Sequence, residues 1–528
     1  MASLKSLLKD TAIYGISSIA GRFVNYLLVP IETYAWAAGG GQFGVITNVY
    51  SYIGILIIAL TFGMETTFFR FANKEGENAR MVYSTALRMV GAVALVFALL
   101  VLACLKPLTA AMGYADHAWY IGTMAVCVAV DAWTSIMFDY LRYQHKPWKF
   151  MALKLANILI NVALVGTFLF VLPHFGLLIP GLYAADGTPD VGIVFYVNLF
   201  VSVVTVLLLS REMCGVAYGF DKALCRRMLS YTWPMLILGI AGQLNQSAST
   251  ILFPYFFDGD ISEAHAQLGI YGATIKIAMI MVMITQAFRY AYEPFVFGQS
   301  KEKNSKETYA KVMKYYVIFT LFAFRFAYEP FVFGNKDADK KDTYAKVMKF
   351  YVIFTLFAYL AVIGYMDILR HIVARSYWEG LRVVPIVMAA EIMFGIYFNL
   401  SFWYKLTDRT IWGAWFSLLG CVVLIAIDVL FIPRFSYMAC AWAGFAAYGI
   451  CMVTSYFFGQ KYYPIRYPLR DIAFYVVVAV ALFAAMTWGN AHLGTWVSLG
   501  VNTLLLLVYL AIVVMKDLRG ILRRRKAA

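Results

Sequence analysis

The sequence is dominated by apolar stretches that are long enough to cross a lipid bilayer. About fourteen of them run from Thr11 to Lys516, and those at 191–210, 411–433 and 495–515 carry few or no charges. Hydrophobic residues make up 62% of the 528 residues, which leaves too little polar sequence for a sizeable soluble domain. The pattern therefore predicts an all-α integral membrane protein and excludes a soluble enzyme.

Positive charge recurs in every second loop between these stretches. The formal net charge is +15, and the Lys and Arg residues gather in short loops, such as those around Arg142 and Arg226, and in the basic C-terminal tail. By the positive-inside rule these loops and both termini are cytoplasmic, and the number of crossings is even. The loop containing Arg370, Arg375 and Arg382 is an exception. Short basic loops beside apolar stretches favour contact with anionic membrane lipids over nucleic-acid binding.

Short sequence matches between the two parts of the chain indicate an internal repeat. The aligned pairs are SIAGRFVN at 18–25 with GIAGQLNQ at 239–246, QFG at 42–44 with QLG at 267–269, and FRFA at 69–72 with FRYA at 288–291. Their constant order favours two like-oriented lobes over chance similarity between apolar helices. The predicted parts are an N-lobe of six helices at 1–210, a cytoplasmic linker at 211–230, a C-lobe of six helices at 231–460, and two further helices with the basic tail at 461–528.

A second repetition lies inside the predicted C-lobe. AFRYAYEPFVFG at 287–298 recurs as AFRFAYEPFVFG at 323–334, and TYAKVMKYYVIFTLFAF at 308–324 recurs as TYAKVMKFYVIFTLFAY at 343–359. This is a recent tandem duplication or an assembly error. The added unit has only about ten consecutive apolar residues before charged residues and a proline interrupt it, too few for a full crossing. We therefore predict an interfacial or re-entrant cytoplasmic insert around 299–342.

Polar residues within the predicted spans point to a shared cavity. Arg22 and Asn25 lie on one face of the first span, and the aligned part of the seventh span carries Gln243 and Gln246. Arg22 lies near mid-bilayer, and Lys276 in the eighth span reaches a similar depth. Intramembrane charges are costly unless paired or hydrated, and polar faces of spanning helices must meet protein or water. These five residues are therefore candidates for substrate binding in a cationic cavity. Such a cavity favours an anionic cargo such as a pyrophosphate.

Other charged residues near or within the spans have two interpretations each. Cations at the predicted cytoplasmic ends extend the cationic path or reach lipid headgroups, and they are Arg70, Arg88 and Arg289. Intramembrane carboxylates are candidates for proton or sodium coupling, or else form structural pairs such as one between Arg22 and Asp131; they are Asp131, Glu391 and Asp428. Neither a metal-ligand constellation nor a phosphate-binding glycine loop is found in the sequence, so we predict no metal, no cofactor and no catalytic residue.

Three segments resemble one family of membrane proteins. They are KDTAIYGISSIAGRFVNYLLVP at the start, FDYLRYQHKPWKFMALKLANILINV at 138–162 and SYFFGQKYYPIRYPLR at 455–470. The sequence resembles the polysaccharide biosynthesis, or Wzx-type lipid-linked oligosaccharide flippase, branch of the multidrug/oligosaccharidyl-lipid/polysaccharide superfamily. The resemblance covers nearly the whole chain apart from the insert.

The resemblance implies a MATE-like fold of about 14 transmembrane helices, in two six-helix lobes plus two C-terminal helices. It also implies export of an undecaprenyl-pyrophosphate-linked oligosaccharide across the bacterial cytoplasmic membrane by alternating access, for O-antigen, lipopolysaccharide or capsule biosynthesis. Arg22 corresponds in position to the first-span cation that members of the superfamily aim at the lipid diphosphate. The partners implied are the lipid-linked substrate, membrane lipids and polysaccharide polymerase or assembly proteins.

Three other functions fit the sequence less well than a flippase. A MATE-like exporter of drugs or organic cations would favour a carboxylate where the first span carries Arg22. A membrane polymerase or ligase would need a large outer loop with catalytic residues, yet the longest predicted outer loop is only PHFGLLIPGLYAADGTPD. A non-transporting scaffold would leave the mid-membrane cations without a purpose. The sequence therefore favours a transporter that is not an enzyme.

Overall fold

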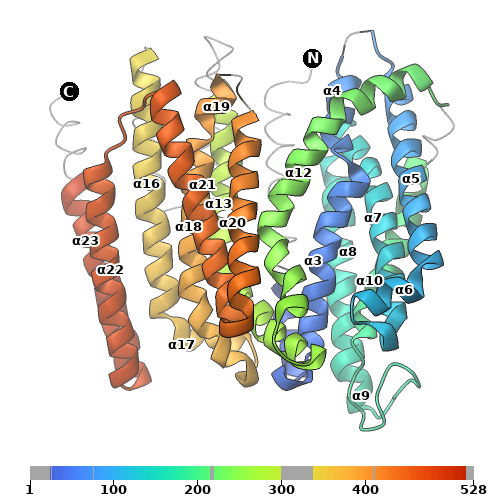
Figure 1. Ribbon diagram of the computed structural model, residues 1–528, viewed down its shortest axis with the longest axis horizontal. Helices are drawn as coiled ribbons and strands as arrows, with labels where there is room; N and C mark the ends of the chain where they lie inside the picture. Colours follow the sequence, from blue (N-terminus) through green and yellow to red (C-terminus); the bar gives the residue numbers. More distant parts are fainter. Residues whose placement is uncertain are drawn as a thin grey trace. The chain divides into compact units, whose positions relative to one another are not determined.

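A computed structural model of the chain describes residues 24, 26–74, 76–213, 219–298, 337–407, 409 and 411–518. Within these ranges, the side chains at 234, 238, 287–298, 337–340, 342 and 343 are not described. The predicted insert and the basic tail lie largely outside the described residues. What is described is almost entirely helical (Figure 1), apart from short 3-10 and π turns and two isolated bridges around Tyr183.

Eleven helical segments among the described residues are long and apolar enough to cross a membrane. Their mean hydropathy over the best window ranges from 1.4 to 2.5, and a further apolar helix at Gly192–Leu208 is shorter. These segments confirm the predicted all-α, multi-pass membrane architecture. The full count of fourteen helices and the cytoplasmic position of both termini stay predictions.

The chain forms two compact units. The first comprises Met1–Ala273 with Leu424–Cys440, and the second comprises Thr274–Val423 with Ala441–Ala528. Three helices contribute to both units, and they are α13 (Ile261–Gly298), α20 (Ile411–Phe435) and α21 (Tyr437–Tyr462). The lobe boundaries predicted from the sequence stay a prediction.

The first unit is built mainly around α7, which packs against α3, α5 and α10. The helices that lie wholly in this unit are α2 (Leu28–Ala35), α3 (Gln42–Thr61), α4 (Met64–Ala72), α5 (Ala79–Ala103), α6 (Leu105–Ala111), α7 (Ala118–Tyr143), α8 (Pro147–Gly166), α9 (Leu172–His174), α10 (Gly192–Leu208), α11 (Ser210–Met213) and α12 (Lys222–Phe256). Two apolar clusters form its core, one of them centred on the fully buried Phe68, Leu87 and Ile136. Long apolar helices bury their backbone polar groups internally, which is the condition for crossing a bilayer.

A sharp corner between α3 and α4 positions α12 in this unit. Phe62 and Gly63 both adopt left-handed backbone conformations, with φ of 36° and 71°, which ends α3 and redirects the chain. A glycine accepts this conformation without strain. The buried Thr232 hydroxyl of α12 donates a hydrogen bond to the carbonyl of Phe62. Helix α12 then runs beside α3 (Figure 1).

In the second unit, α16 packs against α18, α22 and α23. The helices of this unit are α16 (Asp337–Gly364), α17 (Met366–Leu369), α18 (Val384–Leu400), α19 (Phe402–Leu406), α22 (Leu469–His492) and α23 (Thr495–Val513). The last two form an antiparallel pair (Figure 1). An aromatic cluster around Trp403 and Phe416 packs α19 against α20 and α21.

Polar contacts fasten the α22–α23 pair to α16 at both of its ends. At one end, Lys349 Nζ on α16 donates to Asp471 Oδ2 at 2.7 Å and to Asp517 Oδ1 at 2.6 Å. At the other end, Asn502 Nδ2 on α23 donates to the carbonyl of Gly364 at 2.8 Å. Between helices in lipid the apolar side chains gain little by leaving the bilayer, so such hydrogen bonds and ion pairs matter for association.

We expect Lys349→Met to lower the free energy of unfolding by about 3 kcal/mol, because it leaves the largely buried Asp517 carboxylate without its cation. The Lys349 and Asp517 side chains are only 12% and 13% exposed. The matched control is Lys516→Met, since Lys516 pairs with Asp471 at 3.1 Å where both side chains are about one-third exposed. That control should cost no more than about 1 kcal/mol. Unfolding in detergent, followed by circular dichroism, measures both; equal losses would contradict the prediction.

Candidate functional site

A stripe of polar side chains runs between α7, α8 and α10 inside the first unit. The hydrogen-bonded pairs are Asn161 with Asn198 at 3.1 Å, Asp131 with Ser202 at 2.7 Å and Asn157 with Thr205 at 2.8 Å. The three α10 residues recur at steps of four and three, so they share one face of that helix. Asn198 Nδ2 also donates to the Tyr50 hydroxyl of α3 at 2.5 Å. Four helices thus contribute to one polar network within an apolar bundle.

The stripe ends in charged residues. Lys154 on α8 is exposed and lies within electrostatic reach of Asp131 and Asp139 on α7. Arg142, one turn beyond Asp139, forms ion pairs with Asp139 at 3.3 Å and with Glu65 of α4. Carboxylates and cations therefore alternate along one side of α7. Asp131 is the member of this series that lies within a predicted span, and a carboxylate there is costly unless it is paired or protonated, so Asp131 is a candidate site for an ion or a proton.

Glycines bring α3 unusually close to α12 and α13. A Cβ atom at Gly44 would lie 1.8 Å from the carbonyl oxygen of His265. One at Gly269 would lie 3.0 Å from the amide nitrogen of Gly44, and one at Gly272 would lie 2.1 Å from Thr47 Oγ1. Only residues without a side chain permit this backbone approach, as is common between membrane helices. We call this contact between α3, α12 and the first turns of α13 the glycine seam.

A buried hydrogen-bond network also joins the elements of the glycine seam. Asn48 Nδ2 donates to the carbonyl of Thr250 at 2.8 Å, and the Tyr114 hydroxyl donates to Asn48 Oδ1 at 2.9 Å. The Tyr114 hydroxyl also lies 3.1 Å from His265 Nε2. One turn from Asn48, the Thr250 hydroxyl donates to Ser51 Oγ at 2.6 Å. Helices α3 and α12 are thus joined both by close packing and by hydrogen bonds.

Asp428 lies in the first unit near the end of α20. Its side chain is fully buried, and its polar neighbours are Ser249 on α12 and Cys440 on α21. Hydroxyl and thiol groups offer little compensation for a buried carboxylate. A bound cation or a proton would offset that cost, so the geometry keeps Asp428 as a candidate for ion coupling.

The remaining predicted residues lie at separate places. On α12, Gln243 is half-buried, with its amide against Gly54 of α3, whereas Gln246 is exposed. In the second unit, Lys276 on α13 and Glu391 on α18 are both half-buried. Gln243, Gln246 and Lys276 stay predicted members of the cationic cavity, and Glu391 stays a predicted candidate for ion coupling.

The predicted cytoplasmic-end cations differ in their surroundings. The Arg70 guanidinium lies 4.0 Å from the centroid of the Tyr231 ring, which is a cation–π contact, and Arg88 is exposed on α5. The residues outside the description are Arg22, Asn25 and the side chain of Arg289. The predicted bridge between Arg22 and Asp131 therefore stays untested.

Several residues of the site were not singled out from the sequence, including Asn48, Tyr114, Ser202 and His265. A signal for the glycine seam was present in the repeat. Gly44 and Gly269 are the glycines of the matching QFG and QLG motifs, and the structure brings these two glycines into contact. Asn198 and Ser202 carry no comparable signal, because isolated polar residues are ordinary in long apolar helices.

We expect Gly44→Ala to lower the free energy of unfolding by about 3 kcal/mol, because the new methyl group meets the His265 backbone carbonyl. Gly54→Ala meets only the flexible end of Gln243, at 2.6 Å, and should cost less than about 1 kcal/mol. Gly242→Ala on α12 is the matched control, since its methyl group would meet no described residue outside its own helix within 4 Å. Thermal unfolding of the three purified variants tests this order, and a Gly44 variant as stable as the Gly242 variant would refute it.

No protein-family model and no curated protein matches the chain. Among solved structures, the chain is similar to the lipid II flippase MurJ in an inward closed conformation, with a TM-score of 0.63, 12% identity, and coverage of 96% of this chain and 99% of the flippase. It is also similar to an inward-facing multidrug resistance MATE family transporter of the MOP superfamily (TM-score 0.59, 11% identity, 83% and 93% coverage). The chain is also similar to a MOP superfamily transporter from Pyrococcus furiosus (TM-score 0.52, 12% identity, 87% and 98% coverage). The chain therefore has the fold shared by MurJ and the MATE transporters.

Proposed function

We propose that the protein is a flippase that moves an undecaprenyl-pyrophosphate-linked oligosaccharide across the bacterial cytoplasmic membrane by alternating access. The product would serve surface polysaccharide biosynthesis, such as O-antigen or capsule. The transport step moves a lipid headgroup across the bilayer and needs no covalent chemistry, so we propose no enzymatic activity. Substrate binding is assigned to the cationic residues Arg22 and Lys276, with Asn25, Gln243 and Gln246 beside them.

The observation that carries this proposal is the extent of the structural match. The lipid II flippase covers 96% of this chain, whereas the multidrug transporters cover 83–87%. The chain's two last helices, α22 and α23, are fastened to α16 by Lys349 and Asn502 and so belong to the folded protein. A lipid-linked substrate also accounts for intramembrane cations, because charge-assisted hydrogen bonds to phosphate oxygens are strong.

The glycine seam supplies a structural element for alternating access. It joins α3, which was predicted to lie in the N-lobe, to α12 and α13, which were predicted to lie in the C-lobe. Rocking of the lobes would require the Asn48–Thr250 and Ser51–Thr250 hydrogen bonds to break on one side of the membrane. Interhelical hydrogen bonds in membranes average only about 0.6 kcal/mol, so opening the seam is energetically feasible.

Ion coupling is the second element of the proposal. Asp428 on α20 is next to Ser249 on α12, the helix that also forms the glycine seam. A cation or proton bound at Asp428 would therefore change the packing of α12. Asp131 and Glu391 are the further candidates for coupling.

The second candidate function is a MATE-like exporter of drugs or organic cations. It is favoured by the similarity to multidrug transporters of the same fold. Arg22 in the predicted first span argues against it, because a cationic substrate would be repelled there.

The decisive measurement is translocation of a fluorescent polyprenyl-pyrophosphate oligosaccharide by the protein in proteoliposomes. We expect transport by the wild type and at least a tenfold loss in Arg22→Ala, with partial rescue in Arg22→Lys, because a mid-membrane cation would bind the diphosphate. Gln246→Ala should have a smaller effect, since a neutral amide contributes less than a cation. No transport of any glycan lipid, together with efflux of organic cations, would establish the exporter instead.

A cysteine pair tests whether the glycine seam opens. Ser51→Cys with Thr250→Cys places two thiols where hydroxyl groups now lie 2.6 Å apart, which suits a disulfide bond between α3 and α12. Oxidation should stop transport by more than tenfold, and a reductant should restore it. The two single-cysteine variants control for the native cysteines. Unchanged transport by the cross-linked protein would show that the seam is static packing.

A further inference from the structure

The first turns of α12 have one exposed face, along which basic side chains are followed by apolar ones. Lys222 and Arg226 come first, and Leu229, Trp233 and Ile237 follow at steps of three and four residues. The three apolar side chains are 45%, 62% and 48% exposed. Residues at this spacing share one side of a helix. Cations, an aromatic ring and an aliphatic side chain thus follow one another along a single line.

The opposite face of the same turns is buried, and its packing fixes the rotation of α12 about its own axis. Leu224 and Met228 are 1% and 0% exposed and belong to the core packed around α5 and α7. The Asp221 carboxylate caps the helix by accepting hydrogen bonds from the amides of Ala223 and Leu224, at 2.8 and 3.1 Å. Thr232 attaches the next turns to the corner at Phe62. The cationic face is therefore held outward.

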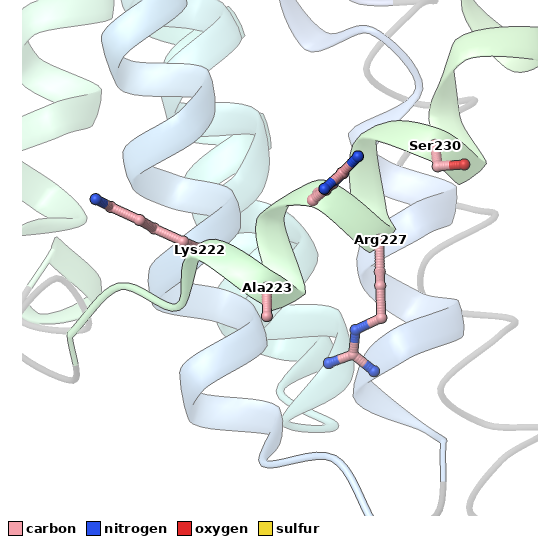
Figure 2. Close-up of a pocket in the computed structure, with 5 residues that line it drawn as sticks. Lys222, Ala223, Arg227 and Ser230 are labelled. Atoms are coloured by element: carbon pink, nitrogen blue, oxygen red, sulfur yellow. The ribbon is translucent and has the colours of Figure 1, made fainter.

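Two of the cations on these turns are available to a ligand. Lys222, Ala223, Arg226, Arg227 and Ser230 line an open pocket of about 700 Å³ (Figure 2). Arg227 is taken up by an ion pair with Glu77 at 2.5 Å, and Figure 2 shows it extending in a different direction from Lys222. Neither Lys222 nor Arg226 forms an ion pair with any residue in the described ranges. One hydroxyl group, on Ser230, completes the polar lining.

We propose that this face of α12 binds the phosphate headgroup of an anionic phospholipid of the surrounding membrane. Lys222 and Arg226 hold the phosphate, since they stand one turn apart, about 6 Å along the axis. Leu229, Trp233 and Ile237 contact the acyl chain, and Trp233 stands about 10 Å from Arg226, at the interfacial depth that tryptophan prefers. Its lining shares no residue with the proposed transport cavity, and lipid binding there goes beyond the proposed function.

The composition of the site favours a bulk phospholipid over the glycan-bearing substrate. A saccharide is recognised by several donors and acceptors in fixed positions, whereas this lining offers Lys222, Arg226, the ion-paired Arg227 and one hydroxyl group. Attraction of anionic lipid by exposed Lys and Arg requires only charge and is worth about 1 kcal/mol for each residue. The site therefore selects for charge rather than for sugar structure.

The test is native mass spectrometry of the purified full chain, titrated in detergent with phosphatidylglycerol or phosphatidylcholine. We expect tight binding of phosphatidylglycerol to the wild type, weakened about thirtyfold in Lys222→Gln/Arg226→Gln, which corresponds to the loss of two contacts. Binding should also weaken between 50 and 500 mM salt, as screening requires. Circular dichroism and size-exclusion chromatography establish that the variant is folded.

The matched control is Lys146→Gln/Arg211→Gln, which removes the same charge from two other exposed residues of the first unit. It should retain phosphatidylglycerol binding. Equal weakening in this control, equal binding of phosphatidylcholine, or displacement of phosphatidylglycerol by an equimolar polyprenyl diphosphate would each overturn the proposal. Because the readout is lipid binding rather than transport, its failure would leave the flippase proposal standing.

Discussion

The first unit depends on the contact between backbones at the glycine seam. In a bilayer the surroundings of a helix are as apolar as its side chains, so burial of apolar surface does little to hold helices together. Close approach at Gly44, Gly269 and Gly272 supplies dispersion contacts instead, and it brings Asn48 within hydrogen-bonding distance of the Thr250 carbonyl. Any side chain at Gly44 would meet the His265 backbone and push α3 away from α13.

The apolar surroundings of the helices also limit where charged groups can lie in the first unit. Asp131, Asp139, Arg142 and Lys154 lie on neighbouring faces of α7 and α8, where each has an opposite charge or a hydroxyl group nearby. Asp428 is different, because it is fully buried and, among the described residues, has Ser249 and Cys440 as its polar neighbours. The partners of Asp131 and Asp139 offset part of the cost of burying these two carboxylates, so a bound cation or proton would change the free energy of Asp428 more.

Much of the architecture followed from the sequence because membranes impose simple rules. Apolar length predicted the spanning helices, and the eleven candidate spans confirm the multi-pass, all-helical fold. The repeat motifs QFG and QLG indicate two lobes, but the motifs alone do not predict that Gly44 and Gly269 are in contact. Asp131 was singled out as an intramembrane carboxylate, but its hydrogen bond to Ser202 joins residues 71 positions apart and could not be foreseen from either helix.

The sequence by itself determined that this protein is built from apolar helices, that cations and carboxylates lie within or beside them, and that the segment 211–230 is basic. Those properties depend on local composition and on the thickness of a bilayer. Only the tertiary structure decided that α3 meets α12 and α13 through glycines, that Lys349 binds both Asp471 and Asp517, and that Lys222 and Arg226 face outward. Such contacts join distant parts of the chain, and which face of a helix meets its neighbour is settled by packing and not by periodicity alone.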